Sequence, residues 1–250
     1  MGKFSADIIN TYVLPEKVAV FWAGQAGFII KTPKNKLIAL DLYLSDCCRR
    51  YFGFKRIMPY LLEPHELKFD LVIASHGHYD HFDVDAIPML LDEDTKFLGA
   101  VDTKAECDRL GLKDNLNFIK CTEEFVFDDI KIKGVPCDHG DLAPDALGLW
   151  IEVGNKSIYY MGDTAYRSDL FENEAVKGAD ILIAPINGMF GNLNSEEAAC
   201  AAQILKPGVT VPCHFWNFAQ HEGNPNEFIN AMEERNLNYK VLRMGEGIVV

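Results

Sequence analysis

Hydrophobic residues in this chain come in short runs, separated by glycine, proline and polar turns. The runs at residues 18–22, 28–31 and 36–40 are rich in β-branched and aromatic residues, so they predict three strands joined by short turns. Residues 71–74 form a continuous apolar run, which is typical of a strand buried on both faces. The irregular segment 45–68 lies before it, and a loop of that length is usually functional or disordered.

Helix and strand patterns alternate through the rest of the chain. Asp102 and Gly111 bracket one predicted helix, and Asn194 with Glu197 forms a capping box that starts another, so helices are expected at residues 103–110, 195–205 and 226–235. Further strands are predicted at residues 125–127, 130–135, 146–153, 157–161, 181–184 and 209–212, with 239–243 and 247–250 closing the sheet. Because no segment has the composition of a linker, we expect one α/β domain over residues 1–250, with two sheets and outer helices.

Composition and charge narrow the function classes. The apolar fraction of 48% and the charged fraction of 24% are ordinary for a globular protein, and the net charge of −13 argues against nucleic-acid binding. No run approaches the ~20 apolar residues of a membrane span, and the first 14 residues do not form a signal peptide pattern, so a cytoplasmic location is expected. The seven scattered cysteines predict reduced, mostly buried thiols. The sequence leaves the oligomeric state open, and a homo-oligomer is compatible with it.

Four ligand-type residues follow the apolar run 71–74 in the pattern His76-x-His78-x-Asp80-His81. Residues two apart in an extended segment face the same way, so His76 and His78 can bind one metal ion together. A turn beyond His78 then lets Asp80 and His81 face a second position. Packing alone does not explain four such residues within six positions, so the pattern predicts a metal site.

Three more ligand-type residues, His139, Asp163 and His214, each come just past the end of an apolar run. Taken singly, each would more often be structural, but as a set placed alike they favour a shared site. If these strand ends lie along one rim of the sheets, four loops converge there. Of the two remaining histidines, His65 is expected to have a surface or capping role. His221, in the polar loop after His214, could contact substrate, but a solvated loop position is favoured.

The seven ligands divide into two sets with a bridging carboxylate: His76, His78 and His139 for one ion, Asp80, His81 and His214 for the other, and Asp163 between them. A nitrogen-rich set favours zinc over magnesium or calcium, with manganese or iron left open. Two such ions lower the pKa of a coordinated water towards ~7 and so provide a nucleophile at neutral pH.

In this order the motifs resemble the metallo-β-lactamase superfamily. The resemblance covers nearly the full chain and rests on residues 22–28, 40–41, the histidine cluster, 162–164 and His214. It implies a four-layer αβ/βα sandwich of two mixed sheets and outer helices, with a dinuclear site at the sheet edge. His78 stands where the di-iron flavoprotein relatives carry glutamate, which argues against reduction of oxygen or nitric oxide.

Within that superfamily the chain looks most like the L-ascorbate-6-phosphate lactonase-like hydrolases. The similar segments are residues 186–188, Asn192 with 196–198, and 214–216, together with the long segment ahead of the metal motif. The resemblance implies hydrolysis of a small lactone, and manganese as well as zinc as the metal.

The predicted reaction is therefore hydrolysis of a small lactone or related ester, of an anionic sugar derivative. A hydroxide attacks the carbonyl carbon, and the catalytic Asp80 orients it and passes its proton to the leaving alkoxide. Candidate substrate-binding residues are Asn187, Asn192, Trp216, Arg49 and Arg50. The two arginines suit a phosphate or carboxylate, although a solvated basic loop explains them equally well. The alternatives are phosphodiester hydrolysis at the same site, and a binding protein with a relic site.

Overall fold

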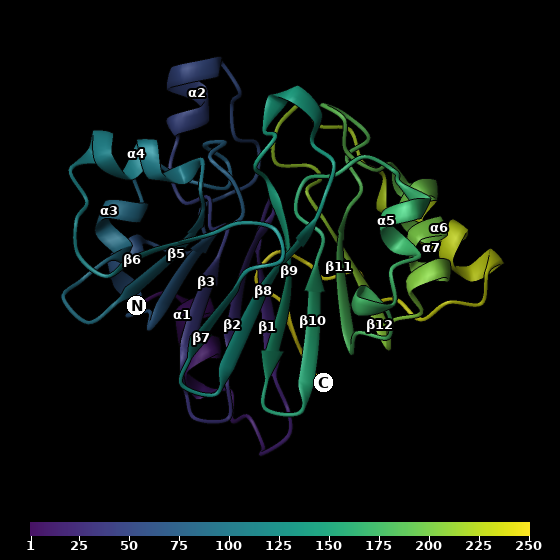
Figure 1. The fold of residues 1–250 in the computed structure, drawn as a ribbon, viewed down its shortest axis with the longest axis horizontal. Helices are drawn as coiled ribbons and strands as arrows, with labels where there is room; N and C mark the ends of the chain where they lie inside the picture. The colour runs from purple at the N-terminus through teal and green to yellow at the C-terminus, as the bar shows by residue number, and fades with distance from the viewer.

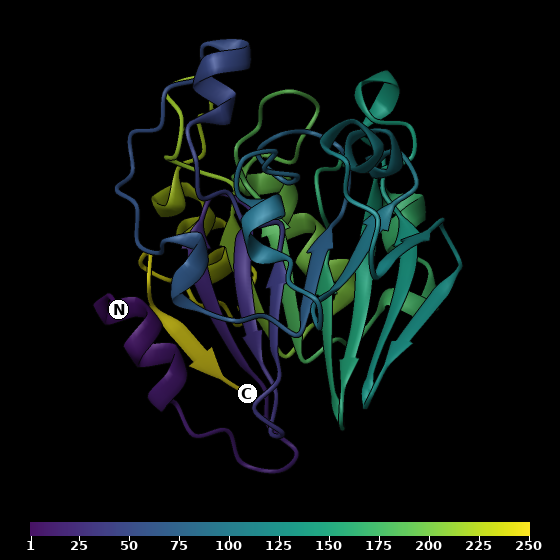
Figure 2. The same ribbon diagram turned by 90° about the vertical axis from the view of Figure 1, so that its left-hand side faces the viewer.

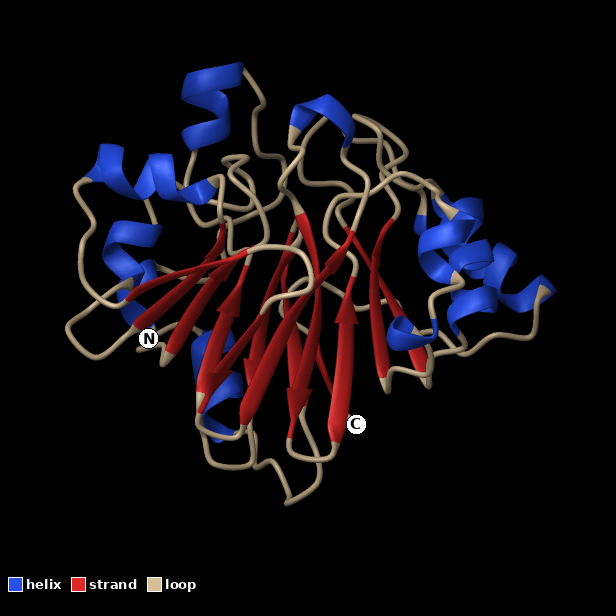
Figure 3. Ribbon diagram, in the orientation of Figure 1, coloured by secondary structure: helices blue, strands red, loops and turns tan.

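Two β-sheets lie face to face, and helices cover the outer side of each (Figures 1 and 3). The computed structural model describes residues 1–250. The first sheet has seven strands in the order β13-β1-β2-β3-β4-β5-β6, and the second has six in the order β12-β11-β10-β9-β8-β7. Helices α1, α3 and α4 lie beside the first sheet, and α5, α6 and α7 lie beside the second (Figure 1). The four layers match the predicted sandwich.

The first sheet is built from β1 (Ala19–Gly24), β2 (Gly27–Lys31), β3 (Leu37–Leu40), β4 (Leu71–Ala74), β5 (Lys96–Ala100), β6 (Leu116–Ile119) and β13 (Gly247–Val249). Alternate residues of its strands face opposite layers. Val20 and Trp22 pack into the core between the sheets, whereas Ala19 and Phe21 pack under the outer helices. Strands β3 to β6 run parallel, so their carboxyl ends share one edge.

The second sheet contains β7 (Glu124–Phe127), β8 (Ile130–Pro136), β9 (Leu147–Val153), β10 (Lys156–Tyr160), β11 (Ile181–Pro185) and β12 (Val209–Cys213). Strands β10, β11 and β12 are parallel, and β8 runs in the same direction because β9 is antiparallel to both β8 and β10. The carboxyl ends of β8, β10 and β12 therefore meet at one edge of this sheet.

The helices are α1 (Lys3–Asn10), α2 (Cys47–Phe52), α3 (Ile87–Leu90), α4 (Thr103–Leu110), α5 (Ser168–Phe171), α6 (Ser195–Leu205) and α7 (Pro225–Glu234). The predicted helices 103–110 and 195–205 are confirmed with their stated bounds. Helix α6 starts with the predicted capping box, and α4 ends at Gly111 with φ of +73°. The Asp102 carboxylate does not cap α4; it accepts a hydrogen bond of 2.9 Å from the Gly77 N–H instead.

Several sequence predictions were wrong or incomplete. Helix α2 and a 3-10 turn at Pro64–Glu66 lie within the segment predicted to be irregular, and α1, β5 and β6 were not predicted. Figure 2 shows α1 beside β13, where Phe4 contacts Phe21. Residues 239–243 do not form a strand, since Tyr239 makes only an isolated bridge to Thr210. No helix combines the length and hydrophobicity needed to cross a membrane.

Candidate metal centre

The predicted ligands lie at the carboxyl ends of four strands, which face one another across the gap between the sheets. The cluster from His76 to His81 follows β4 of the first sheet, and His139, Asp163 and His214 follow β8, β10 and β12 of the second. Strands β8, β10 and β12 run in the same direction, so their three loops share one edge, and contacts of His78, Asp80 and His81 with His139, Asp163 and His214 bring the β4 loop to it. The structure thus brings together residues separated by up to 138 positions, as His76 and His214 are.

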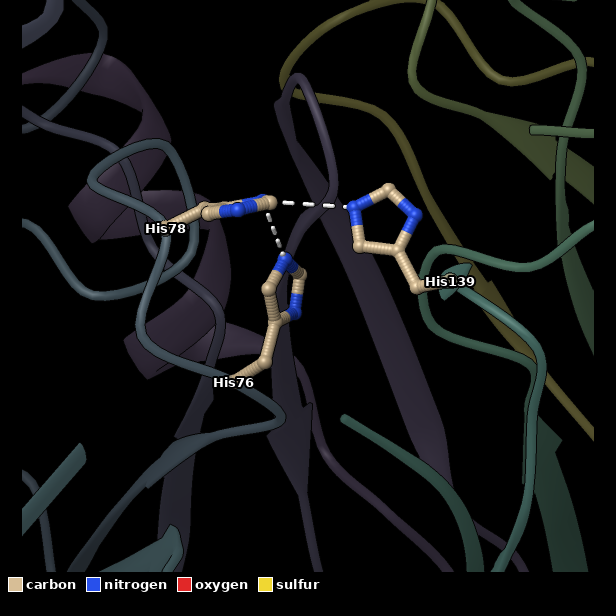
Figure 4. Close-up of side chains that lie close together, drawn as sticks. All are labelled: His76, His78 and His139. Carbon is tan, nitrogen blue, oxygen red and sulfur yellow. Dashed lines mark hydrogen bonds between the residues drawn. The ribbon is translucent and has the colours of Figure 1, made fainter. Parts of the chain in front are cut away.

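His76, His78 and His139 form the first group of ligand atoms (Figure 4). The His78 Nδ1 lies 3.1 Å from the His76 Nε2 and 3.2 Å from the His139 Nε2. The other nitrogen of His78, Nε2, lies 3.2 Å from the Leu142 carbonyl oxygen. Donation of that N–H to Leu142 leaves a lone pair on Nδ1, which points at the two other rings.

Asp80, His81 and His214 form the second group. The Asp80 Oδ2 lies 3.6 Å from the His81 Nε2 and 3.3 Å from the His214 Nε2, and the two ring nitrogens are 3.2 Å apart. Both imidazoles are almost completely buried.

Asp163 lies between the two groups. Its Oδ1 is 3.3 Å from the His81 Nε2 and 3.2 Å from the His214 Nε2, while its Oδ2 is 3.6 Å from the His139 Nε2. Gly162, with φ of +64°, makes the turn after β10 that aims this carboxylate inward. A Cβ at that position would lie 2.7 Å from the Leu147 carbonyl oxygen, so only glycine fits there.

The chemistry of this donor set fits divalent metal ions. Burial lowers the pKa of His76 well below its usual value, so its imidazole is neutral and can donate a lone pair. Burial also opposes the charged form of His81, but the carboxylates of Asp163, Asp80 and Asp41 outweigh it and hold that pKa well above its usual value. A site that stabilises positive charge on His81 will likewise stabilise a cation bound by its Nε2.

Asp41 orients the His81 ring, a role that the sequence analysis missed. Its Oδ2 accepts hydrogen bonds of 2.7 Å from the His81 Nδ1 and from the Tyr160 hydroxyl, and its Oδ1 accepts one from the Ser75 N–H. Asp41 contacts the Nδ1 side of His81, whereas the Nε2 faces the ligand cluster, so the contact fixes the tautomer of a ligand. The available signal was an aspartate directly after a buried strand, as at Asp163.

Gln25 and His221 pack against the second group, and the solvated position expected for His221 was wrong. The Gln25 Nε2 donates a hydrogen bond of 2.9 Å to the Asp80 Oδ2 and lies 3.1 Å from the His221 Nδ1. The His221 ring stacks on His214, with centroids 4.8 Å apart, and is buried rather than solvated. His65 is exposed, as predicted.

A cavity of about 390 Å³ opens onto the ligands, and it contains some of the predicted substrate-binding residues. Asn192 lines it, while Asn187 and Trp216 line a neighbouring cavity of about 750 Å³ that shares His221 with the first. Arg49 and Arg50 line neither cavity. The guanidinium of Arg50 is instead held by the Asp85 carboxylate, with contacts of 2.6 and 2.7 Å, so the structure does not place these arginines at the site.

Comparison with known proteins assigns the family. A family model described as a β-lactamase superfamily domain matches residues 19–214, from β1 to the last predicted ligand. The chain belongs to the β-lactamase superfamily. Among its relatives, the UPF0173 metal-dependent hydrolase of Polynucleobacter asymbioticus is 29% identical over 94% of this chain and 86% of the relative. The UPF0173 metal-dependent hydrolase of Pelotomaculum thermopropionicum is 28% identical over 92% of this chain and 98% of the relative.

Solved structures show the same fold. Igni18, a metallo hydrolase from Ignicoccus hospitalis, has a TM-score of 0.76 at 21% identity and covers 94% of this chain and 98% of its own. An isothiocyanate hydrolase from Delia radicum gut bacteria has a TM-score of 0.73 at 20% identity, and the match covers 92% of this chain and 98% of that protein. YhfI of Bacillus subtilis, described as a metallo-β-lactamase fold protein, has a TM-score of 0.70 at 17% identity, and the match covers 94% of this chain and 99% of that protein. The predicted metallo-β-lactamase fold is confirmed.

Proposed function

We propose that this superfamily member is a metal-dependent hydrolase that holds two divalent ions and opens a small lactone or related ester. The observation that carries the proposal is the division of the seven ligands into two groups with Asp163 between them. Two bound ions would lower the pKa of a coordinated water towards ~7 and polarise a carbonyl group. The five imidazoles favour zinc, and manganese remains the second candidate.

Asp80 is the residue proposed to handle the proton. Its carboxylate lines the cavity, so it can accept a hydrogen bond from the nucleophile and pass that proton to a leaving alkoxide. The Gln25 amide donates to the Asp80 Oδ2 at 2.9 Å and so restricts its rotation. The same oxygen lies 3.3 Å from the His214 Nε2.

Phosphodiester hydrolysis is the competing reaction, because the same arrangement of ligands can bind a phosphate. Phosphodiesters are anionic, and no lysine or arginine lines the cavity above the ligands, so the cavity favours the lactone over the phosphodiester.

Isothiocyanates form a third substrate class. The apolar cavity wall suits a neutral electrophilic carbon, and an isothiocyanate hydrolase shares the fold.

The test is a substrate panel assayed on protein that has been stripped of metal and reloaded separately with zinc and manganese. We expect about two equivalents of bound metal by mass spectrometry and turnover of lactones above phosphodiesters. His78→Ala should lose metal and turnover, whereas His65→Ala, which alters an exposed histidine outside the site, should keep both. Preference for phosphodiesters, or full turnover by His78→Ala, would overturn the proposal.

A further inference from the structure

Aromatic side chains form two walls around the cavity that opens onto the ligands. On one side Phe52 contacts Tyr79, with ring centroids 5.4 Å apart. On the other side Phe54 lies 5.6 Å from Phe190, and Phe190 lies 5.4 Å from His221. All five residues line the cavity, together with Cys48 and Leu142. A ligand that enters therefore contacts mainly rings and aliphatic carbon before it reaches the metal ligands.

Much of this apolar surface is exposed to water in the absence of a ligand. Phe52 is 57% exposed, Phe190 42% and Leu142 59%. Exposed apolar groups gathered at one concave place mark a binding surface, because covering them releases the water that they order. The driving force for filling the cavity is therefore burial of apolar surface.

No lysine or arginine lines the cavity. Arg109, which lies over the Tyr79 ring, is already paired with Glu106, and Arg50 is paired with Asp85. The chain as a whole carries a net charge of −13, which repels anions at long range. A phosphate remote from the metal ligands would find no side chain to neutralise it, so the phosphorylated sugar suggested by the sequence lacks a partner here.

Asn192 supplies a polar contact within the aromatic walls. The residue is only 6% exposed, it lines the cavity, and neither its Oδ1 nor its Nδ2 has a hydrogen-bond partner. A buried amide without partners is costly, so a ligand that offers a hydrogen-bonding atom would satisfy it. The amide can both donate and accept, which suits an ether, carbonyl or amide group on an otherwise apolar substituent.

Phe190 reaches the cavity at the expense of backbone strain. Its φ of +55° lies in the left-handed region, which costs about 1 kcal/mol or more for a side chain of this size. Gly188 and Gly191 on either side also have positive φ, so the loop turns sharply at this phenylalanine. A half-exposed aromatic ring kept in a strained conformation over a cavity indicates that its position is used.

We propose that the substrate is a neutral lactone or ester with an apolar alkyl or aryl substituent, which packs against the Phe54 and Phe190 rings on the cavity side and hydrogen-bonds to Asn192. This inference rests on the proposed hydrolysis, because the reacting carbonyl must lie at the metal ligands while the substituent fills the cavity. It replaces the anionic sugar by a neutral, apolar group and names Phe190 and Asn192 as specificity-determining residues.

The experiment compares four γ-butyrolactones on the zinc and manganese forms: unsubstituted, with a pentyl chain at C5, with a butoxymethyl chain at C5, and with a phosphorylated hydroxymethyl group at C5. We expect kcat/KM to rise about fourfold for each of the first methylene groups that is buried. The butoxymethyl lactone should exceed the pentyl one because its ether oxygen meets Asn192, and the phosphorylated lactone should be the poorest. If the unsubstituted or phosphorylated lactone is preferred, this inference fails while the hydrolase proposal stands. If no lactone is opened, the proposed function fails first.

Variants test the two named residues, and calorimetry with the matching γ-lactams, whose unstrained amide is much harder to hydrolyse than the ester, reports binding. Phe190→Ala should weaken binding of the pentyl lactam about tenfold and weaken the unsubstituted lactam much less, because only the pentyl chain packs on the ring. Asn192→Leu should remove the advantage of the butoxymethyl chain while the pentyl lactam still binds. Tyr12→Ala, which alters an aromatic residue that is 76% exposed and outside the cavity, is the matched control. If Phe190→Ala, Asn192→Leu and Tyr12→Ala all bind every lactam like the unaltered protein, the assignment of these residues is wrong.

Discussion

Asp41→Asn perturbs the carboxylate behind His81 while it preserves the shape of the side chain. Asp41 is completely buried and accepts hydrogen bonds from the Ser75 N–H, the Ser75 hydroxyl, the His81 Nδ1 and the Tyr160 hydroxyl. Asparagine exchanges one acceptor oxygen for an NH₂ group, so at least one of these donors faces another donor. A buried donor left unpaired costs about 1–3 kcal/mol. Loss of a carboxylate that orients a metal-binding histidine typically weakens metal affinity by about 10–100-fold.

Competition with a chromophoric chelator measures that affinity, and urea unfolding of the metal-free protein measures stability separately. We expect Asp41→Asn to bind zinc about 10–100-fold more weakly, in addition to unfolding more easily. The control is Asp180→Asn, because Asp180 also accepts several hydrogen bonds, from Lys156 and Ser157, but lies away from the ligands. Asp180→Asn should destabilise the fold and leave metal affinity unchanged. If Asp41→Asn bound zinc as tightly as the unaltered protein, the carboxylate would not be what holds His81 in place.

Three further changes test how the fold supports the site. Gly162→Ala should lower both metal content and melting temperature, because the new Cβ meets the Leu147 carbonyl, whereas Gly111→Ala, also at positive φ but with open space around it, should reduce stability only. Burial lowers the pKa of Lys31, whose Nζ donates hydrogen bonds to the Ile8 and Ile9 carbonyls. The unfolded state therefore binds more protons than the folded state, so the free energy of unfolding should rise as the pH increases towards 10.5. Lys31→Met should remove that increment in urea titrations at several pH values, and an unchanged slope would contradict the assignment. Asn194→Ala removes the capping box of α6 and should cost about 1 kcal/mol of stability with turnover retained; lost turnover at full stability would show that the cap serves the site instead.

The metal ligands could be predicted from the sequence because their signals are local. Each of the four ligand segments directly follows an apolar run, and a parallel strand delivers the residue after it to a fixed edge. The spacing within His76–His81 needs only a turn of a few residues to serve two positions. Helix α6 was equally predictable, because Asn194 and Glu197 satisfy each other within one turn. In these cases the physical cause lies within a few residues of the signal.

The surroundings of the ligands could not be predicted in this way, because their causes are distant in the chain. His221 is buried through contacts with Gln25, which lies 196 positions away, and with Phe54 and Phe190. Arg49 and Arg50 likewise suggested an anion-binding site in the sequence, but in the structure Asp85 pairs with Arg50. A charged side chain reports its residue type in the sequence, but its partner is fixed only by the fold.

The metal ligands determine which reaction is possible, whereas the residues around them determine which substrate is accepted. The family model ends at residue 214, so His221 lies beyond the segment that carries the shared features of the superfamily. His221, Phe54 and Phe190 come from three separate loops, yet they meet in one wall over the ligands. Loops can change without disturbing the strands that aim the ligands, because few backbone hydrogen bonds of the sheets depend on them. The substrate preference of this protein should therefore follow from the aromatic wall and Asn192, and exchange of the loops that carry Phe54 and Phe190 should alter specificity while metal binding is retained.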